Sequence, residues 1–451
     1  MPKKKTALTI EERLQQALVP AEEQPYEVPE NWVWVRLGAI AEIVTGGTPS
    51  KKHPEYYGGN FPFYKPSDLD QGRLTYDASE YLSEEGKNVS RIIPKNSTAV
   101  CCIGSIGKCG YLMCEGTTNQ QINSAIPKIN SLCLYYYLCT ENFVQDLLSM
   151  ASATTIAIVN KSKMESCAFP LPPLSEQQRI VERIEELLAK LDEAKERLQE
   201  VADSFAVRKA AILHKAFTGE LTKQWRRENG VSYESWEEKK GEDFFEYVTS
   251  GSRGWAKYYS DKGSIFIRMG NLNHGTIELD FSDIQYVELP DQVEGQRSKL
   301  QKNDILISIT ADVGMIALVR EDMDAYINQH VALARPKNDL YAEFLAWYFV
   351  SNDGLQQMQN KQRGATKIGL GLQDIRSIIL KIPTLPEQHE IVRLIDDLLA
   401  RERAAQQAAE QALASIDLMK KSILARAFRG ELGTNKASEA SALELLRQVL
   451  S

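Results

Sequence analysis

The segment 104–109, with the sequence GSIGKC, comes nearest to a catalytic motif. In a nucleotide-binding loop of the Walker A type, glycines and a lysine in this order bind phosphate oxygens. That loop also needs glycine where Cys102 stands and serine or threonine where Cys109 stands. Because the segment fails at both positions, we predict a turn or a loop that faces DNA here rather than a nucleotide site.

No other part of the sequence assembles catalytic residues. The Pro290-Asp291 pair could begin a nuclease motif, but no Asp/Glu-x-Lys follows at a suitable distance. There is no GxGxxG after a strand, no Asn-Pro-Pro-aromatic segment, and no HExxH or GxSxG motif. The five histidines are scattered. We therefore predict a recognition or scaffold protein that is not an enzyme by itself.

The seven cysteines all lie between Cys101 and Cys167. An odd number in one stretch fits reduced thiols better than a disulfide framework. Cys101, Cys102, Cys109 and Cys114 could hold a metal ion, but no CxxC pair occurs and no histidine is near. We expect buried free thiols, with no metal and no cofactor in this chain.

Composition and charge limit the classes of protein further. A length of 451 residues suggests two to four domains, and the absence of any apolar run near ~20 residues or of a signal-peptide core predicts a cytoplasmic protein. The net charge is −8, and no segment is a basic block that would by itself indicate nucleic-acid binding. If the protein binds DNA, local patches or a basic partner must neutralise the phosphates.

The strongest feature is a repeat at a constant offset of 211 residues (385 − 174). Segment 174–221 recurs as 385–432 without a gap, and nineteen of the 48 aligned positions are identical. The matches include Glu-Gln near the start of each copy and Gly-Glu-Leu at its end. A repeat of this length indicates a duplicated architecture.

Both copies have the apolar spacing of a coiled coil, in which positions alternate by four and three residues. We predict an antiparallel pair with Leu191 near Ala412 and Leu198 near Ala405. The alternative is an ordinary helical hairpin within one domain, but some 150 residues separate the two helices. The predicted seams are Ile180, Ile184, Leu187, Leu191, Ala194, Leu198, Val201 and Phe205 in the first copy, and Ile391, Ile395, Leu398, Glu402, Ala405, Ala409, Ala412 and Ile416 in the second.

The stretch before each helix also repeats, more faintly. Short β-rich runs, 98–103 and 304–310, lie between turn clusters, and the helical patches 134–150 and 342–358 follow them. We predict an α+β fold: two similar mixed α/β domains, separated and joined by two long helices that form an antiparallel coiled coil with pseudo-twofold symmetry. The predicted parts are an N-terminal extension with a short helix (1–30), a first domain (31–173), a helix and linker (174–232), a second domain (233–383), a second helix (384–432) and a tail with a short helix (433–451).

These motifs resemble the specificity subunit of type I restriction-modification enzymes. The resemblance rests on LPPLSEQQRIV and IPTLPEQHEIV, on the helix ends AFTGEL and AFRGEL, and on the duplicated plan, and it covers residues 31–432. It implies that each domain is a target recognition domain that reads one half of a split double-stranded DNA sequence. It further implies that the helices set the number of unread base pairs and dock two methylation subunits.

The resemblance also places catalysis in other chains. Two methylation subunits would flip and methylate an adenine in each half-site, and translocating restriction subunits would join through them to cleave unmethylated DNA. S-adenosylmethionine, ATP and Mg would then belong to the partner subunits. Two rival functions remain: a coiled-coil scaffold with no role on DNA, and a stand-alone DNA-binding regulator.

Candidate DNA-binding residues are polar or basic side chains on loops that a sheet can hold rigidly. Two recurring pairs, Asn119-Gln120 and Asn328-Gln329, are predicted instead to brace a turn. In the first domain the candidates are Thr48, Ser50, Lys51, Lys52, Tyr64, Lys65, Ser67, Asp68, Ser105, Lys108, Thr154, Thr155 and Lys161. In the second domain they are Ser252, Arg253, Arg268, Asn271, Asn273, Thr310, Asp312, Arg363, Thr366 and Lys367.

Overall fold

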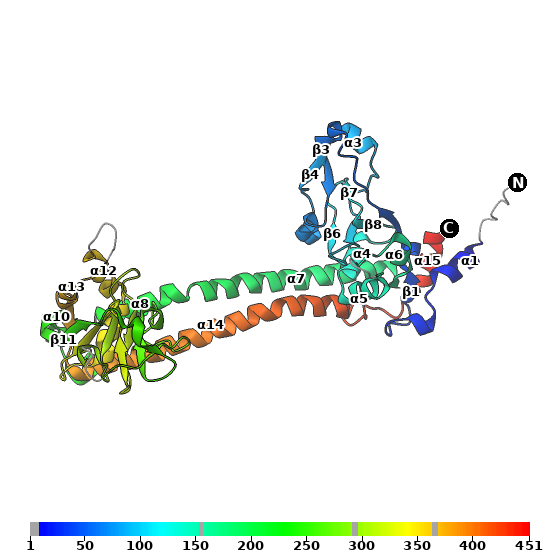
Figure 1. The fold of residues 1–451 in the computed structure, drawn as a ribbon. Helices are drawn as coiled ribbons and strands as arrows, with labels where there is room; N and C mark the ends of the chain where they lie inside the picture. The colour runs from blue at the N-terminus through cyan, green and yellow to red at the C-terminus, as the bar shows by residue number, and fades with distance from the viewer. Residues whose placement is uncertain (1–8, 153–156, 291–295, 363–368) are drawn as a thin grey trace. The chain divides into compact units, whose positions relative to one another are not determined.

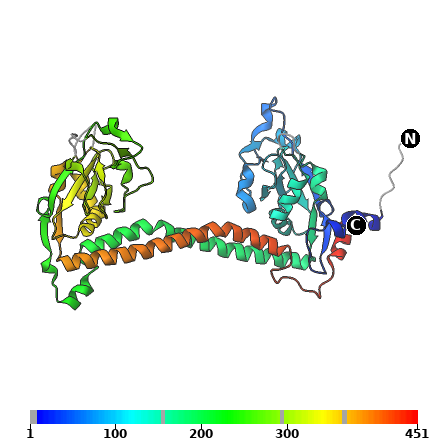
Figure 2. The ribbon, with the colours of Figure 1, turned by 60° about the horizontal axis from the view of Figure 1, so that its bottom comes forward.

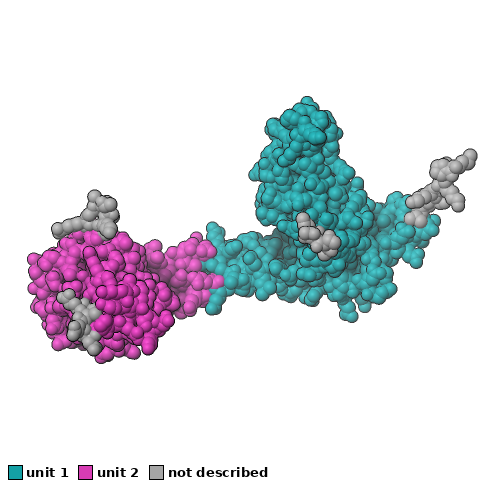
Figure 3. Space-filling model, in the orientation of Figure 1, with its two compact units in different colours: residues 1–198, 411–451 teal, residues 199–410 magenta. Residues whose placement is uncertain are grey.

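A computed structural model describes residues 9–152, 157–290, 296–362 and 369–451 of the chain (Figures 1 and 2). The chain divides into two compact units: unit 1 is Met1–Leu198 with Gln411–Ser451, and unit 2 is Gln199–Glu410 (Figure 3). The boundary crosses both long helices. Each unit therefore contains one globular domain and a part of each long helix.

Unit 1 is a mixed α/β domain. Its strands are β1 (Val33–Arg36), β2 (Ala41–Thr45), β3 (Tyr57–Tyr64), β4 (Glu80–Leu82), β5 (Thr98–Cys101), β6 (Cys109–Tyr111), β7 (Thr117–Thr118), β8 (Ile122–Pro127) and β9 (Ala168–Leu171). Its helices are α1 (Ile10–Ala17), α2 (Leu37–Ile40), α3 (Glu84–Asn88), α4 (Ser131–Leu138), α5 (Glu141–Met150), α6 (Lys161–Ser166), most of α7 (Leu174–Asp203), the end of α14 (Leu385–Ala427) and α15 (Ala442–Leu450).

Unit 2 has the same kinds of element. Its strands are β10 (Glu237–Lys240), β11 (Phe245–Ser250), β12 (Tyr259–Ser260), β13 (Ser264–Ile267), β14 (Tyr286–Val287), β15 (Ile305–Ser308), β16 (Ile316–Leu318), β17 (Ala325–Ile327), β18 (Val331–Pro336) and β19 (Ile379–Ile382). Its helices are the end of α7, α8 (Phe205–Phe217), α9 (Lys223–Asn229), α10 (Gly241–Phe244), α11 (Ala342–Val350), α12 (Asn352–Asn360), α13 (Leu372–Arg376) and most of α14.

The two domains share one sheet topology. Unit 1 has an antiparallel sheet in the order β2-β8-β5-β6, and unit 2 has the matching order β11-β18-β15-β16. A second sheet pairs β3 with β7 in parallel, as β13 pairs with β17. The ladders β1–β9 and β10–β19 complete the match. The faint repeat in the sequence is thus a repeat of the fold, although the second sheet has the order β4-β3-β7 in unit 1 and β12-β14-β13-β17 in unit 2.

Each predicted helical patch is two short helices rather than one. In unit 1 the break lies at Thr140, whose hydroxyl accepts a hydrogen bond from Phe143 N at 3.3 Å and caps α5. In unit 2 it lies at Ser351, which accepts from Gly354 N at 3.3 Å and caps α12. A short hydroxyl side chain is a preferred N-cap because it satisfies an N–H of the first turn. The first long helix is also interrupted, at Ser204 between α7 and α8.

The long helices lie side by side and antiparallel within each unit (Figures 1 and 2). In unit 1 Lys420 Nζ lies 2.5 Å from Asp192 Oδ1, and in unit 2 Arg208 Nε lies 2.5 Å from Glu402 Oε2. The repeat relates Asp192 to position 403 (192 + 211) and Lys420 to position 209 (420 − 211). Each of these positions lies one residue from the observed pair of Glu402 and Arg208. The two units therefore make equivalent interhelical contacts.

The predicted register and part of the predicted seam are wrong. The Asp192–Lys420 pair excludes Ala412 as the neighbour of Leu191, because eight residues span about 12 Å of helix. Ala405 is exposed, whereas Gln406 beside it is half-buried. Of the predicted seam residues only Val201 and Ala405 are exposed, and α14 also buries or half-buries an adjacent stripe with positions 399, 406 and 413. An alanine-rich helix offers two adjacent stripes of similar size, so spacing alone does not choose between them.

The repeated glutamine fastens each long helix to its domain. Gln177 Oε1 accepts a hydrogen bond from Asn130 N at 3.0 Å, and its Nε2 donates to Pro172 O at 2.9 Å. Gln388 makes the same two backbone bonds at the same offset of 211 residues, both at 2.9 Å. Both amides are buried, so these bonds replace the water that burial removes.

The repeated glutamate is a buried junction in each unit. In unit 1 the carboxylate of Glu176 accepts hydrogen bonds from Trp32 Nε1 at 2.7 Å, Asn435 Nδ2 at 2.9 Å and Thr434 Oγ1 at 3.2 Å. Thr434 and Asn435 follow the end of α14. Trp32 therefore joins the start of α7 to the start of the first domain, and Thr434 and Asn435 join it to the segment that follows α14.

Unit 2 repeats this junction with a charged partner. The carboxylate of Glu387 accepts from Arg226 Nη1 at 2.6 Å, Thr222 Oγ1 at 2.7 Å and Trp236 Nε1 at 3.0 Å. Thr222 and Arg226 follow α8. Burial of an ionised carboxylate is costly unless it is hydrogen-bonded or paired, which explains why both glutamates have complete sets of donors.

Helices α1 and α15 meet in unit 1. Helix α1 begins with a capping box, since Glu12 N donates to Thr9 Oγ1 at 3.2 Å and Thr9 N to Glu12 Oε2 at 2.7 Å. Ser441 caps α15 by accepting from Leu443 N at 3.3 Å. Arg13 Nη1 donates to Leu450 O at 2.9 Å, which ties α1 to α15.

Candidate nucleic-acid interface

One loop frame recurs in both domains. In unit 1 the turn after β2 lies on the loop that follows β7: Gly46 N donates to Ile122 O at 3.0 Å and Gly47 N to Thr118 O at 2.8 Å. A Cβ at position 46 would lie 2.2 Å from Asn119 O. Glycine is therefore required here because two backbones approach closely.

Unit 2 repeats this approach after β11. A Cβ at Gly251 would lie 1.9 Å from Ile327 O, and Ser252 forms an isolated parallel bridge with Asn328. The predicted bracing role of the repeated asparagines is confirmed. Gln121 N donates to Asn119 Oδ1 at 3.1 Å, and His330 N donates to Asn328 Oδ1 at 3.0 Å.

A second loop of the frame begins where β3 or β13 ends. Lys65 N donates to Asp68 Oδ2 at 2.7 Å, and Arg268 N donates to Asn271 Oδ1 at 2.9 Å. A short polar side chain that accepts from the backbone nearby stabilises a turn of this kind. Lys65 and Arg268 thus occupy equivalent positions, the first residue after the strand.

Three sequence candidates are bracing or core residues and do not face solvent. Tyr64 is completely buried, and its hydroxyl donates to Tyr76 O at 3.0 Å. Asp68 is buried and also accepts from Ser79 N at 3.0 Å. Asn271 is buried, and its Nδ2 donates to Asp280 O at 2.9 Å. In this structure the three side chains brace loops or fill the core, a role that local polarity in a sequence does not reveal, and their contact with DNA stays a prediction.

Four basic candidates carry acidic partners. Lys65 Nζ lies 2.8 Å from Glu80, Lys108 Nζ 2.6 Å from Asp70, and Arg268 Nη2 2.8 Å from Asp283. Lys161 pairs with Glu165 at 3.6 Å on α6. These pairs are partly exposed, so they contribute little stability and a phosphate can replace the carboxylate. The sequence showed these cations but not their acidic partners.

The other described candidates lie on the loops at or near the surface. Thr48 Oγ1 donates to Gln120 Oε1 at 2.5 Å, Asn273 Nδ2 donates to Asp280 Oδ2 at 3.3 Å, and Thr310 Oγ1 bonds His330 Nδ1 at 2.6 Å. Asp312 Oδ1 lies 2.8 Å from His274 Nε2. Ser50, Lys51, Lys52, Ser67, Ser105 and Arg253 are exposed, and Ser252 is half-buried. Thr154, Thr155, Arg363, Thr366 and Lys367 lie outside the described residues.

The 104–109 segment is a turn, as predicted. It connects β5 to β6, with Gly104 at φ 82° and Gly107 at φ 86°. Unit 2 has the same turn between β15 and β16, with Ala311 at φ 61° and Gly314 at φ 97°. The Ser105 position thus corresponds to Asp312, so equivalent loops carry different exposed side chains.

The structure places two basic residues that the sequence did not single out, Lys257 and Arg297, beside the candidate Arg253. A hollow of about 700 Å³ in unit 2 is lined by Arg253, Lys257 and Arg297, with Gln329 and Trp255 among its other residues. Cations beside aromatic rings suit the phosphates and bases of a nucleic acid. Lys257 and Arg297 lie about 40 residues apart, so only the fold brings them together.

Four of the cysteines are buried thiols, and Cys109, Cys114 and Cys139 are half-buried. All seven are free, and burial raises the pKa of the Cys102 thiol to about 12. Among the described residues no group of three or more His, Cys, Asp or Glu side chains could hold a metal ion. None of the helices in the same residues is both long enough and apolar enough to span a membrane.

Two similar α/β domains share one loop frame, and each is joined to the antiparallel long helices. The chain belongs to the family of type I restriction modification DNA specificity domains, whose model matches residues 29–203 and 233–412. The family and the fold class predicted from the sequence are thereby confirmed. The division of the chain into six parts stays a prediction.

Individual relatives agree with this assignment. The chain is 29% identical over 432 residues to the type I restriction enzyme EcoBI specificity subunit of Escherichia coli, covering 90% of this chain and 87% of that one. It is 24% identical to the EcoKI specificity subunit of Escherichia coli strain K12, with 90% of each chain covered. The crystal structure of the HsdS subunit from Thermoanaerobacter tengcongensis has the same fold, with a TM-score of 0.67 and 18% identity over 91% of this chain and 99% of that chain.

Proposed function

We propose that each domain reads one half of a split double-stranded DNA target and that the chain delivers other subunits to that target. The observation that carries the proposal is the repeated frame with unlike exposed residues. Gly46 and Gly251, and Asn119 and Asn328, hold the same loops in place, while Ser105 in one loop corresponds to Asp312 in the other. Two readers of different sequences need such an arrangement.

The charge distribution supports a role with basic partners. The net charge of −8 opposes binding to a polyanion, and several candidate cations are already paired with carboxylates. Phosphate contacts supply most of the sequence-independent affinity for DNA. We propose that two methylation subunits dock on the long helices and supply the missing positive charge, and that restriction subunits join through them.

Separate substitutions in the two domains test the reading role. The chain is co-expressed with its cognate adenine methyltransferase, and methylated sites are mapped across the host genome. Replacing Thr48, Ser50 and Lys51 with alanine should relax or abolish only one half-site, and Ser252→Ala with Arg253→Ala only the other. An unchanged target, or simultaneous change of both halves by each variant, would contradict the proposal. DNA binding by the chain alone at equal affinity would instead favour a stand-alone regulator.

The helices are proposed to set the length of the unread spacer. The Asp192–Lys420 pair shows that residues 194–198 of α7 lie opposite residues near 413–417 of α14. Inserting four residues in both places adds about 6 Å of helix, which corresponds to roughly two base pairs. The mapped spacer should lengthen while both half-sites stay the same. An unaltered spacer in methylated sites would exclude this role.

A further inference from the structure

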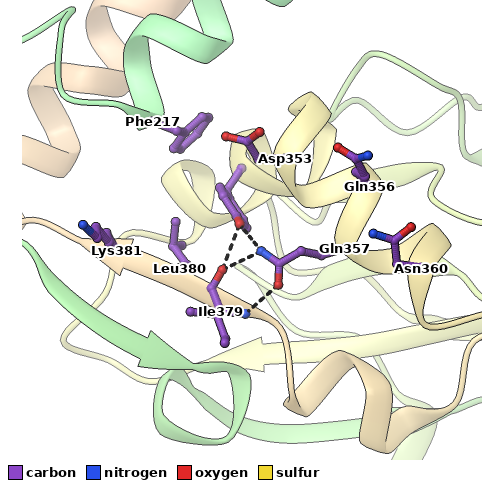
Figure 4. A pocket seen from close by; sticks show the side chains of 9 residues that line it. Phe217, Asp353, Gln356, Gln357, Asn360, Ile379, Leu380 and Lys381 are labelled. Carbon is purple, nitrogen blue, oxygen red and sulfur yellow. Dashed lines mark hydrogen bonds between the residues drawn. The ribbon is translucent and has the colours of Figure 1, made fainter.

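Unit 2 has an open hollow where α8, α12 and β19 meet. Its volume is about 400 Å³, and its lining includes Phe217, Tyr348, Asp353, Ile379 and Lys381. Gln357 Nε2 donates to the Tyr348 hydroxyl at 2.6 Å and to Ile379 O at 2.7 Å, and Ile379 N donates to Gln357 Oε1 at 2.9 Å. Figure 4 shows Gln357 beside Ile379. Phe217 and Tyr348 are buried and provide the apolar wall, whereas Asp353 and Lys381 are exposed.

The same place exists in unit 1. Tyr348 Oη donates to Ile379 O at 2.9 Å, and Tyr137 Oη donates to Ala168 O at 2.7 Å, 211 residues earlier in the chain. The backbone N–H of Ala168 donates to Asp146 Oδ2 at 3.3 Å, as that of Ile379 donates to Gln357 Oε1 at 2.9 Å. The two sites are therefore structural equivalents.

In unit 1 this site is filled by the chain's own N-terminal extension. The Tyr26 ring packs edge-on against Trp34 with 4.9 Å between centroids, and Trp34 Nε1 donates to Tyr26 O at 3.2 Å. The Arg429 guanidinium lies 5.3 Å from the Tyr26 ring centre. Burial raises the pKa of Tyr26 to about 12, and a hydrogen bond with Asn142 acts in the opposite direction. Asn142 is the equivalent of Asp353, since 142 + 211 = 353.

The backbone of that extension also covers a strand edge. Val19 N donates to Trp34 O at 3.0 Å, and Leu18 forms an antiparallel bridge with Val35 on β1. Ala168 beneath it is only 6% exposed. In unit 2 the equivalent residue, Ile379, is 41% exposed, and β10 pairs only with β19 among the described residues.

We infer that this face of unit 2, formed by the β10 edge and the hollow beside Phe217, Asp353 and Ile379, binds an extended, tyrosine-bearing segment of another protein. The occupied site in unit 1 is the template. The segment's backbone pairs with β10, its aromatic ring covers Ile379, and its hydroxyl donates to the Asp353 carboxylate. A segment that adds a strand to an exposed edge, with a pocket for one side chain, is a recurring mode of peptide recognition.

A second copy of this chain could supply the segment only by losing apolar contacts in its own unit 1. The extension continues from α1, whose Leu14 and Ala17 are buried in the unit 1 core with Ala442 and Leu446 of α15. Withdrawing the extension to reach a neighbour would pull on this apolar contact. The inference goes beyond the proposed function, because it uses none of the candidate DNA-binding residues.

The probe for this inference is a fluorescent peptide with the sequence of residues 17–30, titrated with the full-length chain and followed by anisotropy. Replacing the peptide tyrosine with alanine should weaken binding at least tenfold. Asp353→Ala in the chain should weaken binding about tenfold, because a hydrogen bond to a charged group is lost. Asp353→Asn, which copies Asn142 of the filled site, should keep affinity within about threefold.

Each of the following outcomes would overturn the inference. Absence of binding at millimolar peptide, or equal binding to the Asp353→Ala chain, shows that the hollow is not the site. Loss of binding on Asn142→Ala with no effect of Asp353→Ala shows exchange into unit 1 instead. A concentration-dependent dimer in sedimentation that Asp353→Ala abolishes shows that a second copy is the occupant. Circular dichroism of the Asp353→Ala chain checks that its folding is unchanged.

Discussion

Arg226 Nη1 lies 2.6 Å from the completely buried carboxylate of Glu387, whereas the uncharged Asn435 donates to the equivalent Glu176 at 2.9 Å. The same buried glutamate is thus neutralised by an ion pair in one unit and held by uncharged donors in the other. Variants of Arg226 and Asn435 can therefore compare two losses of stability: that of leaving a buried carboxylate without its charged partner, and that of losing one hydrogen bond from an uncharged donor.

Arg226→Met should destabilise unit 2 by about 3–5 kcal/mol, because it leaves an ionised carboxylate without its charged partner. Asn435→Ala should destabilise unit 1 by only about 1–3 kcal/mol, the cost of one lost hydrogen bond to a buried group. Native-state hydrogen exchange of the first turns of α14 and α7 measures the two units separately. Equal losses in both variants would show that the charge of Arg226 is unimportant.

Gly46→Ala and Gly251→Ala should each disable one domain. Their methyl groups would lie 2.2 and 1.9 Å from backbone oxygens, so the loop frame must shift at a cost of about 1–3 kcal/mol. Gly47→Ala and Gly270→Ala are matched controls, since no atom lies within 4 Å of their added carbon. Methylation mapping should show one lost half-site for each frame variant and a normal target for each control.

Lys65→Ala and Arg268→Ala should each reduce the salt dependence of DNA binding by about one phosphate. Both residues begin equivalent loops, and each can exchange its carboxylate partner for a phosphate oxygen. The measurement is the slope of log affinity against log salt for the assembled complex. Lys190→Ala, on the exposed side of α7, is the control that should leave the slope unchanged. A normal slope in both the Lys65 and the Arg268 variant would show that these cations do not contact the DNA phosphates.

The tail that carries Glu439 should loosen on acidification. Arg179 donates to both oxygens of Glu439 at 2.9 and 2.7 Å, and these hydrogen bonds hold the pKa of the Glu439 carboxyl below its usual value of 4.5. A depressed carboxyl pKa stabilises the folded form above the unfolded pKa, and this stabilisation is lost as pH falls through the folded pKa. Hydrogen exchange of residues 434–451 should therefore accelerate, relative to the rest of unit 1, as pH falls below about 4.5.

Glu439→Gln tests that explanation directly. The amide keeps one acceptor but does not titrate, so the variant should show faster exchange at neutral pH and a flatter pH profile. An acid-induced loosening that persists unchanged in Glu439→Gln would assign the effect to other groups.

Several features of the fold could be predicted because they repeat in the sequence at one offset. The Glu-Gln pairs predicted equivalent helix starts, and the structure shows why both residues recur: in both units the glutamate accepts from a tryptophan and the glutamine accepts from a backbone N–H. The turn at 104–109 was also predictable, since two glycines close together favour positive φ. Bracing by Asn119 and Asn328 followed from their recurrence in loops whose other residues differ.

Other features depend on contacts that the sequence does not contain. Tyr64, Asp68 and Asn271 have the composition of DNA-facing loop residues, yet neighbours elsewhere in the fold bury them. Ala405 and Gln406 are adjacent, and only the packing of α14 decides which of them joins the seam.

By itself the sequence determined the duplication, the family and the positions where each long helix begins, because these depend on side chains repeated at a constant spacing. Tertiary structure decided which polar residues brace the loops, which stripe of α14 packs, and that the N-terminal extension fills the Tyr26 site of unit 1 while its equivalent in unit 2 stays open. Those outcomes rest on burial and hydrogen bonds between residues far apart in the chain, and local residue patterns do not specify such pairings.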